Sequence, residues 1–293
     1  MSWPLADYEV SEDVVRALLV EQYPDLVERE RVYAGEGFDN TLWRLGDDLV
    51  ARFPRRESAV ALMEHEIRWL PLLAPHLPLP VPVALRVGRP GGRYPSSWVI
   101  TSWFRGVPAD RASLVRPGEA GELLGRFLRA LHRPAPEAAP HNPWRSGPVA
   151  TRRGAFDERA AALGGEFDEG ALRRIWARAL VAEPWAGPPV WIHGDLHPAN
   201  LLIRAGELAA VLDFGDLAGG DPAVDVAGAW MVLDVASIDR FLAVYRGHDA
   251  AMITRARGWA ALFALFFIEL GLQGRPSYLA TGRATVARLA NTM

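Results

Sequence analysis

The sequence lacks two residue types, and each absence excludes a class of chemistry. It contains no cysteine, which removes disulfides, thiolate nucleophiles and cysteine-ligated metal sites. It also contains no lysine, so all 32 of its lysine-or-arginine residues are arginine. A Walker-type phosphate loop requires a Gly-Lys-Ser/Thr sequence and is therefore excluded. A site that commonly employs lysine must here employ arginine or no such residue.

Long apolar runs and a strong charge imbalance are also missing. The longest apolar run, WAALFALFFIEL at residues 259–270, is too short to span a bilayer and is interpreted as a buried helix. The N-terminal residues are acidic where a signal peptide would be basic. The net charge of −3 gives no nucleic-acid footprint. We expect a cytoplasmic protein without a nucleic-acid, membrane or obligate protein partner.

The order of the expected elements predicts the fold class. Strand patterns occupy residues 31–33, 41–45, 49–53, 83–87 and 97–102, with helices after Ser11 and over residues 57–73. Helical patterns dominate beyond residue 107: a helix around 123–131, a Pro/Ala/Gly-rich surface loop over 135–153, a helix over 156–182, and helices to the end. Strands followed by helices predict an α+β protein in two lobes, with the boundary near residues 103–107.

Two short apolar runs end abruptly in acidic and amide side chains. They are VWIHGDLHPANLLI at residues 190–203 and AAVLDFGDL at residues 209–217. Asp195 follows the first run, Asn200 lies just beyond it, and Asp213 ends the second run. Phosphoryl transfer needs one carboxylate to accept a hydroxyl proton, and a carboxylate and an amide to hold Mg²⁺ across the phosphates. Asn200 and Asp213 offer the hard oxygen ligands that Mg²⁺ prefers.

The pattern His-x-Asp-x-x-x-x-Asn followed by Asp-Phe-Gly is the signature of the protein-kinase-like superfamily. The wording HGDLHPAN and LDFGDLAGGDPAVDVAGAW resembles the aminoglycoside phosphotransferase family of small-molecule kinases. In chain order, YAGEGFDNTLWRL, ARFPRR, EHEIRWLPLL and LLGRFLRALHRP resemble its phosphate-covering hairpin, nucleotide-contacting strand, following helix and first large C-lobe helix. The resemblance implies a two-lobed protein-kinase-like fold. Its nucleotide-binding N-lobe, an antiparallel sheet with a helix, would cover residues 1–103, and its mostly helical catalytic and acceptor-binding C-lobe residues 108–293.

The resemblance also implies roles for individual residues. Asp195 corresponds to the catalytic base, and Asn200 and Asp213 correspond to the Mg²⁺ ligands. Arg52 and Glu66 correspond to the ion pair that orients the nucleotide phosphates. Kinases place lysine at the Arg52 position, but a guanidinium can bind phosphate oxygens with two parallel hydrogen bonds, so the replacement is chemically sensible.

Weaker assignments concern the nucleotide and the loop. Backbone N–H groups of Gly35 and Gly37 would approach phosphates, and Trp103 and Phe104 fall at the hinge, whose backbone would pair with adenine. Trp103 and Phe104 could equally form an ordinary core pair.

Several histidines and acids near the motif have structural interpretations. His193 is interpreted as a structural residue rather than a second base, because Asp195 already fills that role. His197 either faces the phosphates or stiffens its loop. Asp221 and Asp225 are expected to act as a helix N-cap and a loop anchor.

Two other function classes compete with the kinase. A metal-dependent hydrolase could use His193, Asp195, His197 and Asp213 as ligands. It leaves Asn200 without a role, and the remaining histidines are scattered singly. A non-catalytic nucleotide-binding module would be favoured by loss of Asp195, Asn200 or Asp213, but all three are present.

The predicted reaction is transfer of the γ-phosphate of ATP or GTP to a hydroxyl of a small acceptor, with Mg²⁺. An aminoglycoside, and hence antibiotic resistance, is the first candidate; a macrolide or other antibiotic, or a metabolite such as a sugar or amino alcohol, is the alternative. A polycationic acceptor needs several carboxylates. Glu269 is the one acid after residue 250, and the other candidate acids are Glu166, Asp168, Glu169, Asp234 and Asp239. The aromatics Trp259, Phe263, Phe266 and Phe267 are expected to be core.

Overall fold

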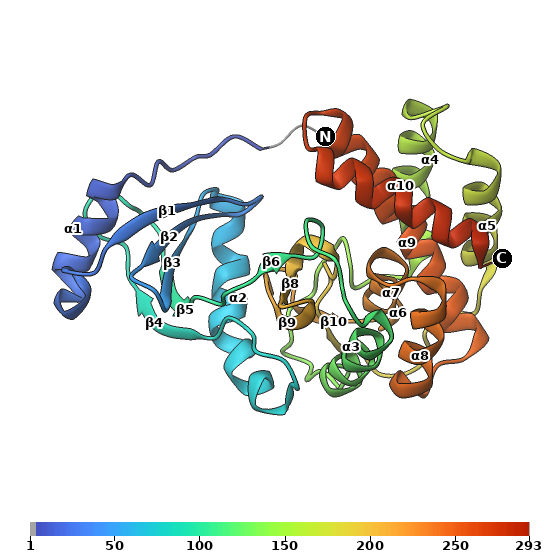
Figure 1. Ribbon diagram of the computed structural model, residues 1–293, viewed down its shortest axis with the longest axis horizontal. Coiled ribbons are helices and arrows are strands. Elements are labelled where there is room, and N and C mark those ends of the chain that lie inside the picture. Colours follow the sequence, from blue (N-terminus) through green and yellow to red (C-terminus); the bar gives the residue numbers. More distant parts are fainter. Residues whose placement is uncertain (1–3, 293) are drawn as a thin grey trace. The chain divides into compact units, whose positions relative to one another are not determined.

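The computed structural model describes residues 4–292, and the chain divides into two compact units (Figure 1). The N-terminal unit runs from the start of the described chain to Pro75 and from Val81 to Arg105. The C-terminal unit begins at Gly106 and also includes the short segment His76–Pro80. The carbonyl of Pro80 accepts a hydrogen bond from the backbone N–H of Val211 at 3.1 Å, which fastens that segment to the C-terminal unit.

The N-terminal unit is built on a five-stranded antiparallel sheet with the order β1-β2-β3-β5-β4. Its strands are β1 (Arg31–Glu36), β2 (Asn40–Leu45), β3 (Leu49–Pro54), β4 (Ala84–Gly88) and β5 (Trp98–Ser102). Gly46, at a φ of +64°, lies in the predicted turn between β2 and β3. Burial alternates along β2, as expected for a strand with one face on a core.

Two helices accompany this sheet. Helix α1 (Glu12–Gln22) begins after Ser11, whose side chain accepts a hydrogen bond from the backbone N–H of Val14 at 3.4 Å. Ser11 therefore acts as the predicted N-cap. Helix α2 (Glu57–Leu73) has the predicted bounds and packs against β3 and β4. Val15, Leu18 and Leu19 of α1 join the buried core cluster that the sheet completes.

The C-terminal unit contains two small sheets that carry the motif. Strand β7 (Val190–Ile192) pairs with β10 (Ala218–Gly220), and the second sheet has the order β6-β8-β9. Its strands are β6 (Val107–Pro108), β8 (Leu201–Arg204) and β9 (Glu207–Val211). Ala205 and Gly206 both have positive φ, which suits the tight two-residue turn between β8 and β9. The first apolar run of the motif thus contributes β7 to one sheet and β8 to the other, and the second run contributes to β9 beside β8.

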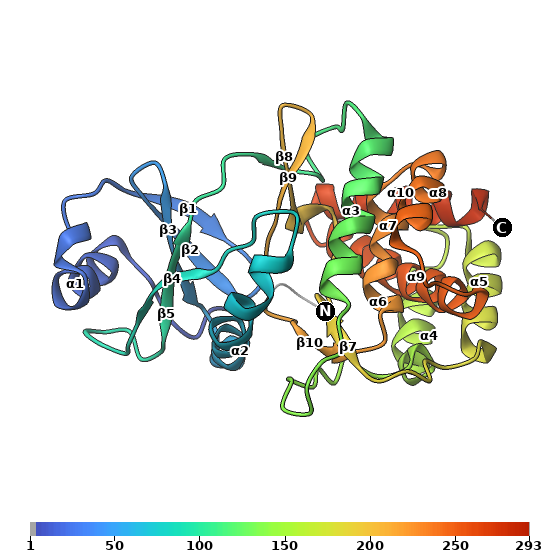
Figure 2. The ribbon, with the colours of Figure 1, turned by 90° about the horizontal axis from the view of Figure 1, so that it is seen from below.

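Helices make up the rest of this unit (Figure 2). They are α3 (Pro117–Leu131), α4 (Arg153–Ala162), α5 (Glu169–Val181), α6 (Ala223–Val226), α7 (Gly228–Val232), α8 (Val235–Tyr245), α9 (Ala250–Leu272) and α10 (Pro276–Asn291). Helix α9 packs against α10, α5 and α6. By length and composition α9 could cross a membrane, but 72% of its apolar window is buried within the protein. The interpretation of residues 259–270 as a buried helix is confirmed.

One predicted element is wrong. The single helix expected over residues 156–182 is two helices, α4 and α5. Gly165 interrupts the helical path with a φ of +88°, a conformation that favours glycine. The second helix then restarts at Asp168, whose carboxylate accepts a hydrogen bond from the backbone N–H of Ala171 at 2.9 Å.

Candidate active site

The structure brings Asp195, Asn200 and Asp213 together at one end of the β8–β9 hairpin. Asp195 follows β7, Asn200 immediately precedes β8, and Asp213 follows β9. The Asn200 side-chain amide donates to the Asp195 carbonyl at 2.9 Å, and the Asn200 carbonyl accepts from the backbone N–H of Leu212 at 2.8 Å. Gly194, at a φ of +81°, lets this loop pass close to the next segment, since a Cβ there would lie 2.8 Å from the Asp216 carbonyl oxygen.

The Asp195 carboxylate is held on both sides but remains partly open. Its Oδ2 lies 3.3 Å from His197 Nε2 and 3.3 Å from the Asn200 amide nitrogen, and its Oδ1 lies 3.5 Å from Arg145 Nη2. Burial raises the pKa of Asp195, but the hydrogen bond from His197 and the nearby Arg145 guanidinium outweigh it and hold that pKa below its usual range. The side chain is 27% exposed. Asp195 is thus an ionised carboxylate that a hydroxyl group can reach.

His193 is a structural residue in this geometry. It is fully buried, its Nε2 lies 2.9 Å from the Leu212 carbonyl oxygen, and its Nδ1 accepts from the backbone N–H of Asp195 at 3.2 Å. A neutral ring with its proton on Nε2 satisfies both contacts. The backbone N–H groups of His193 and Gly194 donate to Asp225 at 2.6 and 2.8 Å. Asp225 therefore has the contacts of the expected loop anchor.

His197 stiffens the loop and also contacts the proposed base. Its Nδ1 accepts from the backbone N–H of Ala199 at 3.3 Å, which caps the short 3₁₀ turn Pro198–Asn200. The ring centroid lies 5.0 Å from that of Phe267 on α9. With Nδ1 acting as an acceptor, the Nε2 proton is directed at Asp195. Of the two roles considered for His197, this geometry supports the stiffening one.

Asn200 and Asp213 carry the kind of oxygen donors that suit Mg²⁺. The Asn200 amide nitrogen donates to Asp195, which leaves its Oδ1 directed away from that residue and able to coordinate. Asp213 has a φ of +58°, a strained conformation for a non-glycine residue that is typical of functional sites. Mg²⁺ characteristically binds one or two such protein oxygens together with water and phosphate oxygens.

The hydrolase alternative is not supported by the geometry. Among residues 4–292, no group of three or more His, Asp or Glu side chains is placed to hold a metal ion. Both ring nitrogens of His193 are already in use.

In the N-terminal unit, Arg52 and Glu66 form a buried ion pair. The Arg52 guanidinium, on β3, makes a two-pronged contact with the Glu66 carboxylate on α2, and its Nη2 donates to Oε2 at 3.0 Å. Both residues are buried. The pairing predicted from the sequence is therefore present, and a planar fork is the geometry that arginine rather than lysine provides.

The other predicted nucleotide contacts differ in the backbone donors that they leave available. Gly35 has a φ of +110° at an irregularity in the β1–β2 register, and a Cβ there would meet no atom within 4 Å. The N–H of Gly37 donates to the Asn40 carbonyl at 2.8 Å, and the N–H of Trp103 donates to the Asp48 carbonyl at 2.7 Å. Gly37 and Trp103 therefore use their N–H groups within the unit, whereas Gly35 lies in open space.

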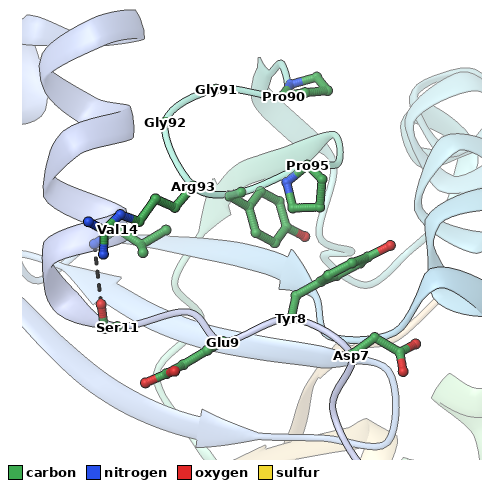
Figure 3. Close-up of a pocket in the computed structure, with 11 residues that line it drawn as sticks. Asp7, Tyr8, Glu9, Ser11, Val14, Pro90, Gly91, Gly92, Arg93 and Pro95 are labelled. Atoms are coloured by element: carbon green, nitrogen blue, oxygen red, sulfur yellow. Dashed lines mark hydrogen bonds between the residues drawn. The ribbon is translucent and has the colours of Figure 1, made fainter.

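An open pocket of about 780 Å³ lies elsewhere in the N-terminal unit (Figure 3). It is lined by Asp7, Tyr8, Glu9, Ser11 and Val14 and by the segment Pro90–Pro95. None of the residues predicted to form the site is among them, and Ser11 there is the N-cap of α1. This pocket therefore does not include the candidate active site.

Most acids considered for a polycation pocket are engaged elsewhere. Glu166 pairs with Arg283 at 2.7 Å, Glu169 with Arg173 at 2.6 Å, and Glu269 with Arg159 at 3.0 Å. The side chains of Asp168 and Asp234 cap helices α5 and α8. Asp239 is exposed on α8, and the two capping residues Asp168 and Asp234 are exposed as well. These contacts leave few of the carboxylates free to attract an aminoglycoside.

Three residues of the site were not identified from the sequence. Asn142 donates from its side-chain amide to Asp216 Oδ1 at 2.6 Å, and Arg145 Nε lies 4.0 Å from Asp216 Oδ2. Burial raises the pKa of Asp216; Arg145 and Asn142 lower it, Asp195 and Asp213 raise it further, and the net change is upward. The expectation of a surface loop over residues 135–153 is therefore wrong at Asn142, which is buried. Asp216 carried a signal, since it directly follows Asp-Phe-Gly.

A family model described as the phosphotransferase enzyme family matches residues 32–262. The chain belongs to this family. A homoserine kinase of Beijerinckia indica subsp. indica is 31% identical over 230 residues, which cover 70% of this chain and 66% of that enzyme, just under two thirds.

Solved structures of the same fold include two groups of antibiotic kinases. The apoenzyme of a macrolide 2′-phosphotransferase of Brachybacterium faecium is 26% identical, with a TM-score of 0.64 over 94% of this chain and 98% of that one. The GDP complex of an aminoglycoside 2′-phosphotransferase is 18% identical, with a TM-score of 0.72 over 97% and 100% of the two chains. This phosphotransferase therefore has the α+β, kinase-like fold predicted from its motifs, with an antiparallel N-terminal sheet and a helical C-terminal part.

Proposed function

We propose that this phosphotransferase is a nucleotide-dependent kinase that moves the γ-phosphate of ATP or GTP to a hydroxyl of a small acceptor in the cytoplasm. The arrangement of Asp195, Asn200 and Asp213 at one end of the β8–β9 hairpin carries the proposal. A partly exposed carboxylate lies beside an amide and a second carboxylate, which is the set of groups that phosphoryl transfer requires.

Each side chain has a separate task in this reaction. Asp195 accepts the proton of the acceptor hydroxyl while His197 and Asn200 fix the orientation of its carboxylate. Asn200 and Asp213 would hold Mg²⁺, which when bound neutralises charge on the phosphate oxygens. Arg52, oriented by Glu66, would contact the nucleotide phosphates, with the Gly35 backbone as a further contact and Phe104 near the base. Gly37 and Trp103 are proposed to shape these segments rather than to donate directly.

For the acceptor, we place a small amino alcohol such as homoserine ahead of an aminoglycoside. The curated relatives that match this chain are homoserine kinases. The acids that would attract a polycation are paired with arginine or cap helices. An aminoglycoside, and with it a resistance role, is the second candidate, because an aminoglycoside kinase shares the fold. A macrolide is the third, because a macrolide kinase shares it at 26% identity.

The test is release of ADP or GDP with Mg²⁺ across homoserine and related amino alcohols, sugars, aminoglycosides and macrolides. We expect turnover with one acceptor class and none in Asp195→Asn. Asp213→Ala should lose Mg²⁺-dependent nucleotide affinity, measured by calorimetry with and without the metal. Full turnover in Asp195→Asn, or unchanged Mg·ATP affinity in Asp213→Ala, would contradict the assigned roles.

A further inference from the structure

Arg145 is a basic residue beside the proposed catalytic base that the kinase motifs do not include. It lies in the segment between α3 and α4, remote in sequence from the motif. Its Nη2 is 3.5 Å from Asp195 Oδ1, its Nε is 4.0 Å from Asp216 Oδ2, and its side chain is 20% exposed. The guanidinium therefore lies between the base and a second carboxylate.

The position of Arg145 is fixed by several contacts from one loop and one helix. Asn142 Oδ1 accepts the backbone N–H groups of Trp144 and Arg145 at 2.8 and 3.1 Å, while its amide nitrogen donates to Asp216. The guanidinium carbon lies 4.8 Å from the ring centroid of Phe263 on α9, a cation–π distance. The side chain is thus oriented before any substrate binds.

The hydrogen-bonding capacity of Arg145 is largely unused. A guanidinium has five N–H donors, and within residues 4–292 the single side-chain hydrogen bond that Arg145 donates is the long one to Asp195. Its Nε is buried and makes no hydrogen bond to any residue between positions 4 and 292. A buried donor without a partner carries a free-energy cost, which a ligand that accepts hydrogen bonds would remove.

The chemistry of the transfer indicates which group Arg145 would meet. The acceptor oxygen must lie within about 2.6–3.2 Å of Asp195 to give up its proton. The phosphorus it attacks is then about 3–3.5 Å from that oxygen. A guanidinium in contact with Asp195 is therefore within reach of the phosphoryl oxygens, where an arginine supplied by the same chain stabilises transferring charge.

We propose that Arg145 binds the phosphoryl group during transfer, held in place by Asn142 and Asp216; this rests on the proposed kinase function. In that step the acceptor hydroxyl gives its proton to Asp195, and its oxygen forms a bond to the γ-phosphorus. The bond from that phosphorus to the bridging oxygen breaks, and the nucleoside diphosphate leaves with the electron pair. Arg145 donates to the equatorial oxygens and neither gains nor loses a proton.

The test compares Arg145→Ala and Arg145→Lys with Arg152→Ala as the matched control. Arg152 stacks over Trp144 at 5.3 Å, and its Nε donates to Thr151 Oγ1 rather than to Asp195 or Asp216. The first readout is binding of ADP, Mg²⁺ and fluoroaluminate, a mimic of the transferring group, against ADP and Mg²⁺ alone. We expect Arg145→Ala to weaken binding of the mimic about 1,000-fold, at the lower end of the range seen for catalytic arginines, and binding of ADP less than about twofold.

The second readout is turnover with the acceptor that wild type uses. Arg145→Ala should lower kcat about 10³-fold with an acceptor KM close to wild type. Arg145→Lys should fall between that variant and wild type, because lysine retains the charge but not the planar fork. Arg152→Ala should match wild type throughout. Thermal unfolding identifies any loss of fold, in which case Arg145→Lys carries the test.

Two results would overturn the proposal. Wild-type affinity for the fluoroaluminate complex in Arg145→Ala would show that the guanidinium does not contact the phosphoryl group. A raised acceptor KM with that affinity unchanged would assign Arg145 to the acceptor. Failure of the kinase function itself is separate, since wild type would then bind no nucleotide or Asp195→Asn would keep full turnover.

Discussion

Two arginines of the C-terminal unit contact aspartates, but the two contacts differ in distance and in exposure to solvent. Arg255 on α9 makes a two-pronged contact with Asp221 at 2.7 and 3.2 Å and donates to the Glu183 carbonyl at 2.6 Å. Both members of this pair are nearly inaccessible. Arg145 instead spans Asp195 and Asp216 at 3.5 and 4.0 Å and is partly exposed. We call the Arg255–Asp221 contact the closed pair, because the hydrogen-bond donors of Arg255 are in use. We call the Arg145 contact the open arrangement, because it leaves N–H donors of Arg145 free.

The difference distinguishes an arginine that stabilises the fold from an arginine that is available to bind a ligand. A buried ion pair is tolerated only when good geometry and further hydrogen bonds offset the desolvation of both charges, and Arg255 meets that condition. It ties α9 to the segment that enters α6, where Asp221 also accepts the Ala223 N–H at 3.0 Å. The expectation that Asp221 is the N-cap is wrong by one position, because the N-cap of α6 is Pro222. Arg145 is partly exposed, so that condition does not apply to it, and its unused N–H donors remain available to an anion.

The largest expected effect is on kcat and comes from replacing Asp195, the proposed catalytic base that Arg145 contacts. Asp195→Asn should lower kcat about 10²- to 10⁴-fold, because an amide cannot accept the hydroxyl proton. The thermal midpoint should stay near wild type, since Asn200 and His197 can still contact an amide. Turnover is measured by nucleoside diphosphate release, with Asp239→Asn, an exposed acid on α8, as the control. If Asp195→Asn lost activity because it unfolded, Asp195 would be a structural residue, and the contrast between reactive and stabilising residues would not hold.

The next largest effect is a loss of stability when the closed pair of Arg255 and Asp221 is broken. Arg255→Ala should lower the free energy of unfolding by about 3–5 kcal/mol, because it leaves the Asp221 carboxylate buried without its cation. Arg145→Ala should cost less than about 1 kcal/mol, as expected for a solvent-accessible pair. Urea unfolding followed by tryptophan fluorescence measures both. Equal costs would mean that closed and open contacts do not distinguish the two roles.

The reactive loop could be predicted from the sequence because its chemistry is local. Asp195 and Asn200 lie on one loop, and Asp213 is separated from them by a single hairpin whose turn carries Gly206. Short separation and a tight turn leave little choice of arrangement. The Arg52–Glu66 pair was also predicted, but from the resemblance, since strand and helix periodicity alone does not show which arginine meets which glutamate.

Arg145 and Asn142 could not be predicted, because their contacts depend on how a loop packs. The segment around them is rich in Pro, Ala and Gly, which indicated a surface loop. Asn142 nevertheless folds inward to reach Asp216, a residue 74 positions away. An asparagine side chain commonly accepts the backbone N–H two residues later and so marks a turn. That local pattern does not specify a hydrogen-bond partner so distant in the sequence. The break at Gly165 was missed for the converse reason, since the apolar spacing continues on both sides of it.

Arg52 extends the comparison to a third arginine, for which a smaller effect, on nucleotide affinity, is expected. Arg52 is closed on Glu66 like Arg255, yet it is proposed to bind nucleotide. Arg52→Lys keeps the charge and loses the fork, so Mg·ATP affinity should fall about tenfold, or about 1.4 kcal/mol. Calorimetric titration measures it, with Arg204→Lys, exposed at the end of β8, as the control. Unchanged affinity would make Arg52 a structural residue of the Arg255 kind.

The smallest expected effect tests the support of the open arginine. Asn142→Ala removes the 2.6 Å bond to Asp216 and the acceptor for the Trp144 and Arg145 N–H groups. Loss of one such bond costs about 1 kcal/mol, so kcat should fall about fivefold through a displaced Arg145. In an Arg145→Ala background the same change should then have little further effect on kcat, because residues in one network are not additive. Thr151→Ala, which removes an exposed bond to the Pro148 carbonyl, is the control. An additive double variant would show that Asn142 supports the loop without acting through Arg145.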